Sequence, residues 1–127
     1  MPSAATLERF IAKVEANLHV EAIAEFYTPH ACMQENNATP RVGREVLMAH
    51  EQRAMDRTAR VISTCVRPVL VNGDTVVIRW IFEFTGKDGS TARIEELAYQ
   101  RWEGELIAQE QFFYDPKQFV ATPATAQ

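Results

Sequence analysis

The chain has little of what marks several large classes of protein. Its 127 residues include only two cysteines, Cys32 and Cys65, which lack the CxxC spacing of redox and zinc sites. Its five glycines stand singly, so no glycine-rich loop is available to hold a phosphate group. No apolar run approaches the roughly 20 residues of a membrane-spanning helix. We therefore expect no cofactor, no metal, no membrane partner and two reduced, buried thiols.

Charge and composition argue against nucleic-acid binding and favour a single domain. The net charge is -4 and the 13 Lys and Arg residues are scattered, whereas nucleic-acid binding needs clustered positive charge. The first eight residues lack the basic and apolar regions of a signal peptide, so we expect a cytoplasmic protein. With 46% hydrophobic residues the chain can bury one core. We expect a single domain over 1–119 and a disordered tail over 120–127.

The first half of the chain has helical periodicity. Apolar residues at helical spacing predict an amphipathic helix over 6–18. A second, short helix is expected at about 20–27, because Pro29 disfavours helix at Thr28. A third is expected at about 43–55, with His50 on its inner face.

The second half alternates as strands do. Strands are expected at about 60–71, 74–85, 90–102 and 106–114, and Asn72-Gly73 is a two-residue hairpin turn. Pro68 predicts an edge or a bulge in the first of these strands. Three helices followed by a meander of strands predict an α+β fold.

Alternation also predicts the two faces of the sheet. An aromatic row containing Trp80 and Phe82 should face the helices, together with Glu96 and alternate residues of the last strand. The outer face would carry Leu97, Tyr99 and Phe112, an apolar patch of the kind that marks an interface. We therefore expect a homodimer formed through this face.

Three segments carry a family resemblance: Phe26 to Glu35, Arg41 to Glu45, and Gln111 to Pro116. They resemble the SnoaL-like proteins, relatives of ketosteroid isomerase and nuclear transport factor two, over about residues 6–116. The resemblance implies a cone-shaped fold in which the helices pack on a curved, mostly antiparallel sheet. It also implies a pocket, although it does not name a substrate.

The resemblance to ketosteroid isomerase places Glu35 at the position of the general base. That isomerase stabilises its oxyanion with a tyrosine on the first helix and a protonated aspartate on the third strand. Here those positions fall on Phe10 and Ala98, neither of which can donate a hydrogen bond. Because losing one such donor typically lowers the rate about a hundredfold, steroid isomerisation is disfavoured.

The candidate site is an apolar cup with a few polar groups. Glu35 is the candidate base, and Glu96 and His50 are weaker catalytic candidates. If both carboxyl groups face one poorly solvated cavity, at least one pKa should be raised. Glu96 paired with Arg93, Glu35 standing in solvent and His50 as an ordinary rim residue are the alternatives. The ligand-binding candidates are Phe10, Tyr27, Trp80, Phe82, Ala98, Gln109, Gln111 and Phe113.

Two functions fit these features. The first is carboxylate-based acid and base catalysis on a small hydrophobic substrate, as in an isomerase, a cyclase or a hydrolase. The second is a dimeric module that binds a ligand in the same cup without turning it over. Glu35 at the base position favours the first, and the two missing oxyanion donors favour the second. The alternative without a ligand is a scaffold that only dimerises, which requires the cup to be filled by its own Trp80, Phe82 and Phe113.

Overall fold

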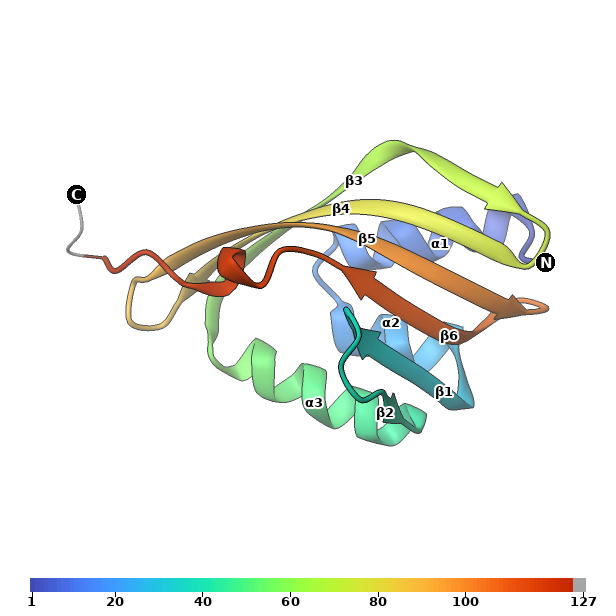
Figure 1. Ribbon diagram of the computed structural model, residues 1–127, viewed down its shortest axis with the longest axis horizontal. Helices are drawn as coiled ribbons and strands as arrows, with labels where there is room; N and C mark the ends of the chain where they lie inside the picture. Colours follow the sequence, from blue (N-terminus) through green and yellow to red (C-terminus); the bar gives the residue numbers. More distant parts are fainter. Residues whose placement is uncertain (125–127) are drawn as a thin grey trace.

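Helices and sheet form two layers in the computed structural model, which describes residues 1–124. Three helices, α1 (Ala4–Glu15), α2 (His19–Phe26) and α3 (Arg44–Asp56), lie on one side of a curved sheet (Figure 1). The strands are β1 (Tyr27–Glu35), β2 (Arg41–Val42), β3 (Thr58–Asn72), β4 (Thr75–Gly86), β5 (Thr91–Glu103) and β6 (Leu106–Phe113). The 3-10 helix η1 (Pro116–Phe119) follows. The predicted α+β fold is confirmed.

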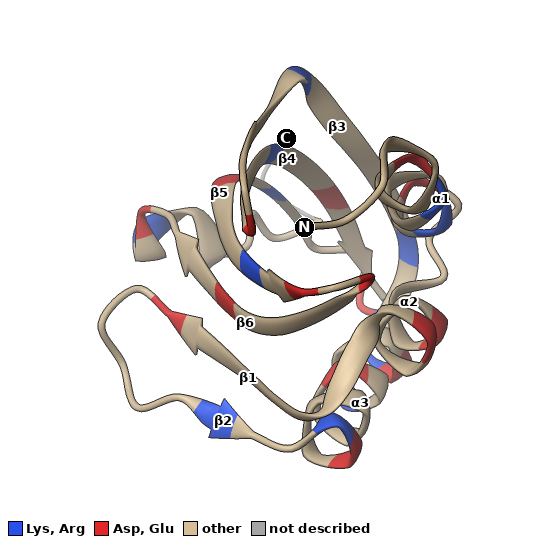
Figure 2. Cartoon of the chain, turned by 90° about the vertical axis from the view of Figure 1, so that its right-hand side faces the viewer, with Lys and Arg blue, Asp and Glu red and all other residues tan. Residues whose placement is uncertain are grey.

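The sheet is mixed and does not close. Its strand order is β2-β1-β6-β5-β4-β3, and only the pair β1 and β6 is parallel. Figure 2 shows the strands curling past the three helices, from β3 at one edge to β2 at the other. The helices therefore cover the concave face, as a cone-shaped α+β fold requires.

Local sequence explains the first helix. The Ser3 side chain accepts a hydrogen bond from the Thr6 backbone amide, which caps α1, and the apolar stripe of Leu7, Phe10 and Val14 is buried. The helix ends at Glu15, earlier than the predicted residue 18. Asn17 has a φ of 66°, the left-handed conformation that ends a helix.

The edge strand β3 carries the feature predicted from Pro68. Its pairing with β4 shifts register between Val66 and Leu70, and among residues 1–124 no strand pairs with its other side. A proline lacks the amide hydrogen that a central strand would need, so both observations have one cause. The prediction of an edge or a bulge is confirmed.

The predicted inner face of the last strand is wrong. Gln109, Gln111 and Phe113 lie on the outer face, whereas Glu110 and Phe112 line the interior. The pairing of β5 with β6 shifts register between Arg101 and Trp102, so β6 holds an extra residue near Ile107. A bulge moves every later side chain to the opposite face. It therefore places Phe112 inside, away from the predicted dimer face.

Two short elements were not predicted. β2 pairs with β1 at the sheet edge. The Gln118 side chain fastens η1 to β5, because it accepts a hydrogen bond from the Glu95 backbone amide and donates one to the Glu95 carbonyl. Beyond η1, Thr91 and Thr122 exchange two backbone hydrogen bonds of 2.9 and 2.7 Å. Residues 125–127 of the predicted tail lie outside the described residues, so the boundary at residue 119 stays a prediction.

Three further observations bear on the first expectations. Both cysteines are free thiols; Cys65 is buried as expected, but Cys32 is only partly buried. Within residues 1–124 no helix is long and apolar enough to span a membrane. In the same range no group of three or more His, Cys, Asp or Glu side chains is arranged to hold a metal ion.

Candidate functional site

A cavity of about 360 Å³ lies between the helices and the concave face of the sheet. Its volume falls in the range of small-molecule sites. Seven aromatic residues line it: Phe10, Tyr27, Trp80, Phe82, Phe84, Phe112 and Phe119. Seven polar side chains also line it: His19, Glu35, His50, Glu51, Arg57, Glu96 and Glu110. Four carboxyl groups thus share an apolar space with one arginine.

One wall of the cavity is an aromatic stack on β4. Trp80 and Phe82 are stacked at 5.6 Å between ring centroids with planes 19° apart, and Phe84 continues the row at 6.0 Å from Phe82. The row follows from strand alternation, which turns every second side chain toward the helices. Such a wall offers a flat surface to an apolar or planar ligand.

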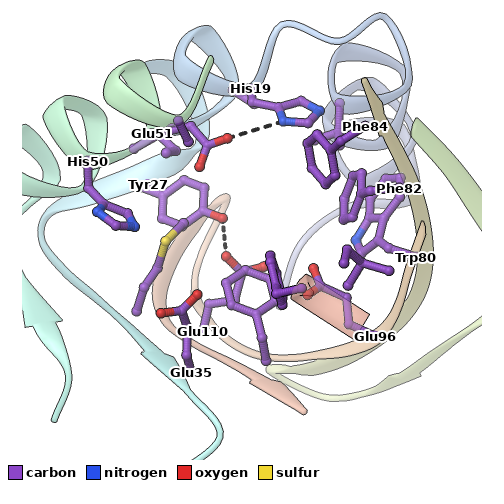
Figure 3. Close-up of a pocket in the computed structure, with 18 of the residues that line it drawn as sticks. His19, Tyr27, Glu35, His50, Glu51, Trp80, Phe82, Phe84, Glu96 and Glu110 are labelled. Carbon is purple, nitrogen blue, oxygen red and sulfur yellow. Dashed lines mark hydrogen bonds and ion pairs between the residues drawn. The ribbon is translucent and has the colours of Figure 1, made fainter. Parts of the chain in front are cut away.

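Glu96 is a carboxyl group without a partner. It lies on β5 directly opposite Trp80 in the strand register and projects into the cavity (Figure 3). Among the residues that the structure describes, no group hydrogen-bonds its carboxyl oxygens. Burial, followed by repulsion from Glu110, Glu35 and Glu51, raises the pKa of Glu96 to about 8. Glu96 is therefore a neutral acid at pH 7 and can donate a hydrogen bond.

Glu35 ends β1 on the other side of the cavity, as Figure 3 shows. Its carboxylate accepts from Arg41 Nη1 over 3.2 Å, and both side chains are 38% exposed. Burial, followed by the negative charge of Glu35, raises the pKa of Tyr114 to about 12. Glu35 thus lines the cavity while remaining in contact with solvent.

A buried hydrogen-bonded chain runs behind the cavity wall. Trp102 Nε1 donates to Gln100 Oε1 over 2.9 Å, and Gln100 Nε2 donates to Glu110 Oε2 over 2.6 Å. The Tyr27 hydroxyl donates to the other oxygen of Glu110. All four side chains are at most 3% exposed. Tyr27 and Glu110, at the end of the chain, are the two members that line the cavity.

The two acidic groups of this chain have raised pKa values. Burial raises the pKa of Glu110 to about 7, although its hydrogen bonds to Tyr27 and Gln100 oppose the rise. Burial and the neighbouring Glu110 raise the pKa of Tyr27 well above its ordinary value. Glu110 therefore exchanges its proton close to neutral pH, while Tyr27 keeps its own.

His19 joins three elements at the edge of the cavity. Its Nδ1 lies 3.2 Å from Glu51 Oε1 and its Nε2 lies 2.8 Å from Ser63 Oγ. This order is that of a nucleophile triad. However, Ser63 does not line the cavity and donates its own hydrogen to Asn17 Oδ1 over 2.8 Å. The group therefore ties α2, α3 and β3 together.

The structure brings most of the predicted site residues to one cavity. Seven of them line it: Phe10, Tyr27, Glu35, His50, Trp80, Phe82 and Glu96. Ala98 is fully buried in the core and does not line the cavity. The outer face of the sheet carries Gln109, Gln111 and Phe113, so these residues cannot contact a ligand in the cavity.

Glu51 and Glu110 line the cavity but were not predicted as site residues. Glu51 neighbours His50 on α3 and looks like a surface residue of a polar helix. Glu110 was assigned to the outer face because the bulge in β6 could not be seen from alternation. The polar side chain of Gln100 on the inner face predicts a polar neighbour on the adjacent strand. Identifying that neighbour as Glu110 requires the correct register of β5 and β6.

Known proteins resemble this chain in both sequence and fold. A family model described as SnoaL-like domain matches residues 7–110. No curated protein matches the chain. A structure described as a candidate SnoaL-like polyketide cyclase from Mesorhizobium loti is similar, with a TM-score of 0.74 and 19% identity over 90% of this chain and 100% of that one.

Two further similar structures contain small molecules. A protein with a ketosteroid isomerase-like fold from Catenulispora acidiphila, in complex with trimethylamine, has a TM-score of 0.76 and 16% identity over 93% of this chain and 91% of that one. TerC, co-crystallised with polyporic acid, has a TM-score of 0.75 and 14% identity over 91% of this chain and 92% of that one. At such identities these likenesses show the fold.

Proposed function

The chain is a member of the SnoaL-like domain family, and from this premise we propose that it binds a small, largely hydrophobic carbonyl compound and moves a proton on it. Glu35 is the proposed general base and Glu96 the proposed general acid. One observation carries the proposal. Within residues 1–124 nothing hydrogen-bonds the Glu96 carboxyl group, which faces an aromatic cavity, and burial raises its pKa to about 8, so that the neutral form predominates at pH 7.

The chemistry follows from the two environments. When a base removes a proton next to a carbonyl group, negative charge develops on the carbonyl oxygen. A neutral carboxylic acid in an apolar site can donate a hydrogen bond to that oxygen. Glu96 would thereby supply the donor that Phe10 and Ala98 lack. Glu35, across the cavity and in contact with solvent, would take the proton and release it.

The surroundings support a small hydrophobic ligand. The stacked Trp80 and Phe82 provide apolar surface, and the ligands in the TerC and Catenulispora structures support small-molecule binding in this fold. His50 lines the same space from α3 and is a weaker candidate for proton transfer.

Deuterium exchange tests the proposal directly. The probe is 2-tetralone, a small aromatic ketone, in D2O, with exchange beside its carbonyl group followed by NMR. The wild type should accelerate exchange, and Glu35→Gln and Glu96→Gln should each lower the rate about a hundredfold or more. Glu103→Gln, on the exposed part of β5, should behave like the wild type. Equal exchange by the wild type and Glu35→Gln would rule out the base.

A non-catalytic binding module is the second candidate. The ion pair between Glu35 and Arg41 favours it, because an arginine that occupies a carboxylate oxygen weakens that oxygen as a base. In this case 2-tetralone would quench the tryptophan fluorescence of the protein with a saturable dependence on concentration. The protein would not accelerate exchange at any pH.

We also propose that the protein forms a homodimer through the outer face of the sheet. Leu97 and Tyr99 are 45% and 49% exposed there, and Phe113 is 42% exposed opposite Leu97 in the register. Val77 lies opposite Tyr99 on β4 and extends the same surface. Phe113 takes the place in this patch that was expected for Phe112. Neighbouring apolar side chains on a sheet face favour association of two copies.

A further inference from the structure

The amide of Gln100 has a fixed orientation. The indole N–H of Trp102 can only donate, so the atom of Gln100 that it meets must be the carbonyl oxygen. The amide nitrogen of Gln100 then necessarily donates to Glu110 Oε2. This side of the Glu110 carboxyl group therefore always accepts a hydrogen bond, whether Glu110 is charged or neutral.

The other side of Glu110 can hold a hydrogen bond of either direction. When Glu110 is ionised, the Tyr27 hydroxyl donates to Oε1, as in the structure. When Glu110 carries a proton on Oε1, it can donate to the Tyr27 oxygen instead. The Tyr27 hydrogen is then free to turn toward the cavity, which Tyr27 lines beside Glu110 (Figure 3).

We propose that Tyr27 and Glu110 form a reversible hydrogen-bond donor for a negatively charged ligand oxygen, so that the cavity takes hydrophobic phenolates and enolates. This inference rests on the proposed function in one respect, that the ligand occupies this cavity. It adds a ligand class and a second donor beside Glu96. An enolate is also the species that proton removal beside a carbonyl group produces.

The charges around the pair leave both directions accessible. From α3, Glu51 repels charge on both groups, and from β5, Glu96 repels charge on Tyr27. His50 on α3 and His19 on α2 line the same cavity, and His19 is paired with Glu51. From α3, Arg44 reaches only the backbone carbonyl of Tyr27, over 3.3 Å. Glu35 and Arg57 also line the cavity. Burial raises the pKa of Glu110 to about 7, so Glu110 exists in both forms near neutrality.

The substitution Glu110→Gln should fix the donor direction. The new carbonyl oxygen must accept from Gln100, whose amide is held by Trp102. The new amide nitrogen then faces the Tyr27 oxygen and donates to it. The Tyr27 hydrogen is thereby directed permanently toward the cavity. This variant imitates the protonated form of Glu110 at every pH.

Binding of 2,4-dinitrophenolate tests this prediction, because this phenol is ionised over the whole range of the experiment. Calorimetry is performed on Glu96→Gln, so that titration of Glu96 does not contribute. The affinity of Glu96→Gln for 2,4-dinitrophenolate should fall about tenfold for each pH unit above about pH 7, because the phenolate binds only when Glu110 is protonated. In Glu96→Gln/Glu110→Gln the affinity should stay constant above that pH.

Two controls complete the test. Tyr27→Phe, also in the Glu96→Gln background, should lose about tenfold or more in affinity at low pH, because the ligand oxygen loses this hydrogen-bond donor. Neutral 1,3-dinitrobenzene should bind all variants alike. The inference is overturned if Glu110→Gln keeps the decline with pH, or if the phenolate binds no more tightly than the neutral compound. Because binding needs no turnover, a failure of Glu35 in deuterium exchange would leave this result intact.

Discussion

Glu96 and Trp80 lie directly opposite each other on β5 and β4, so an unpartnered acid and the largest aromatic side chain of the cavity share one face of the sheet. The apolar surface removes water from the carboxyl group, and the charges of Glu110, Glu35 and Glu51 oppose its ionisation. A carboxyl group in such a place favours its neutral form. The consequences for stability and for ligand binding can both be measured.

Stability should fall as the pH rises. The pKa values of Glu96 and Glu110, about 8 and about 7, lie above the ordinary value of 4.5, so the native state holds protons that the unfolded chain releases. Their contribution is complete below about pH 4.5 and is lost progressively up to about pH 8. Each group contributes a slope of up to about 1.4 kcal/mol per pH unit within its range.

Urea unfolding at a series of pH values measures this slope. Glu96→Gln/Glu110→Gln should remove the decline between about pH 5 and about pH 8. Glu103→Gln, an exposed carboxylate on the same strand, should retain the wild-type slope. A wild-type stability that rises over this range would contradict the raised pKa values.

Trp80 should stabilise the fold by filling the core and by packing its ring against Phe82. Trp80→Ala empties part of a core in which Trp80 is 2% exposed, and should lower the free energy of unfolding by about 3–5 kcal/mol. Trp80→Phe keeps a ring against Phe82 and should lose less. Both values come from urea denaturation at pH 5, where Glu96 is neutral. Equal losses for the two variants would show that a ring at this position contributes nothing.

Ser63 should affect stability without affecting chemistry. Ser63→Ala removes hydrogen bonds to His19 and Asn17 and should lower the free energy of unfolding by about 1–3 kcal/mol. Deuterium exchange of 2-tetralone by the folded variant should be unchanged. A drop in exchange as large as that of Glu35→Gln would instead make the Ser63, His19 and Glu51 group part of the reaction.

The outer face should control association. Tyr99→Glu places a charge in the proposed interface and should convert a dimer to a monomer in light scattering at micromolar concentration. Val42→Glu is the matched control, because Val42 is 62% exposed but lies on β2, outside the patch. A monomeric wild type under the same conditions would refute the proposed dimer.

The sequence predicts the fold well because its patterns are local. Helical spacing around Phe10 and alternation around Trp80 each depend on one element, and the predicted strand ends differ from the observed ones by at most two residues. The ends of β1 and α2 were less clear, since Tyr27 begins the strand where helix was expected. β2 was missed because two residues carry no periodicity.

The residues that line the cavity could be predicted only on strands whose register follows from simple alternation. β4 and β5 alternate without a shift, so Phe82 and Glu96 were placed on the correct face. β6 contains a bulge, which no composition rule reveals, and the one-residue shift exchanged Glu110 for Gln111. Whether Glu35 pairs with Arg41 also depends on how a loop closes, which spacing does not determine.

The protonation state of Glu96 tests most directly whether the cavity holds a neutral carboxylic acid. Carboxyl groups labelled with carbon-13 in glutamate can be titrated by NMR, and the Glu96 resonance is identified by its absence in Glu96→Gln. We expect Glu96 to be mainly protonated at pH 7 and to titrate near pH 8. A Glu96 that is ionised at pH 7, with a pKa near the roughly 4.3 of an unperturbed glutamate, would contradict this expectation.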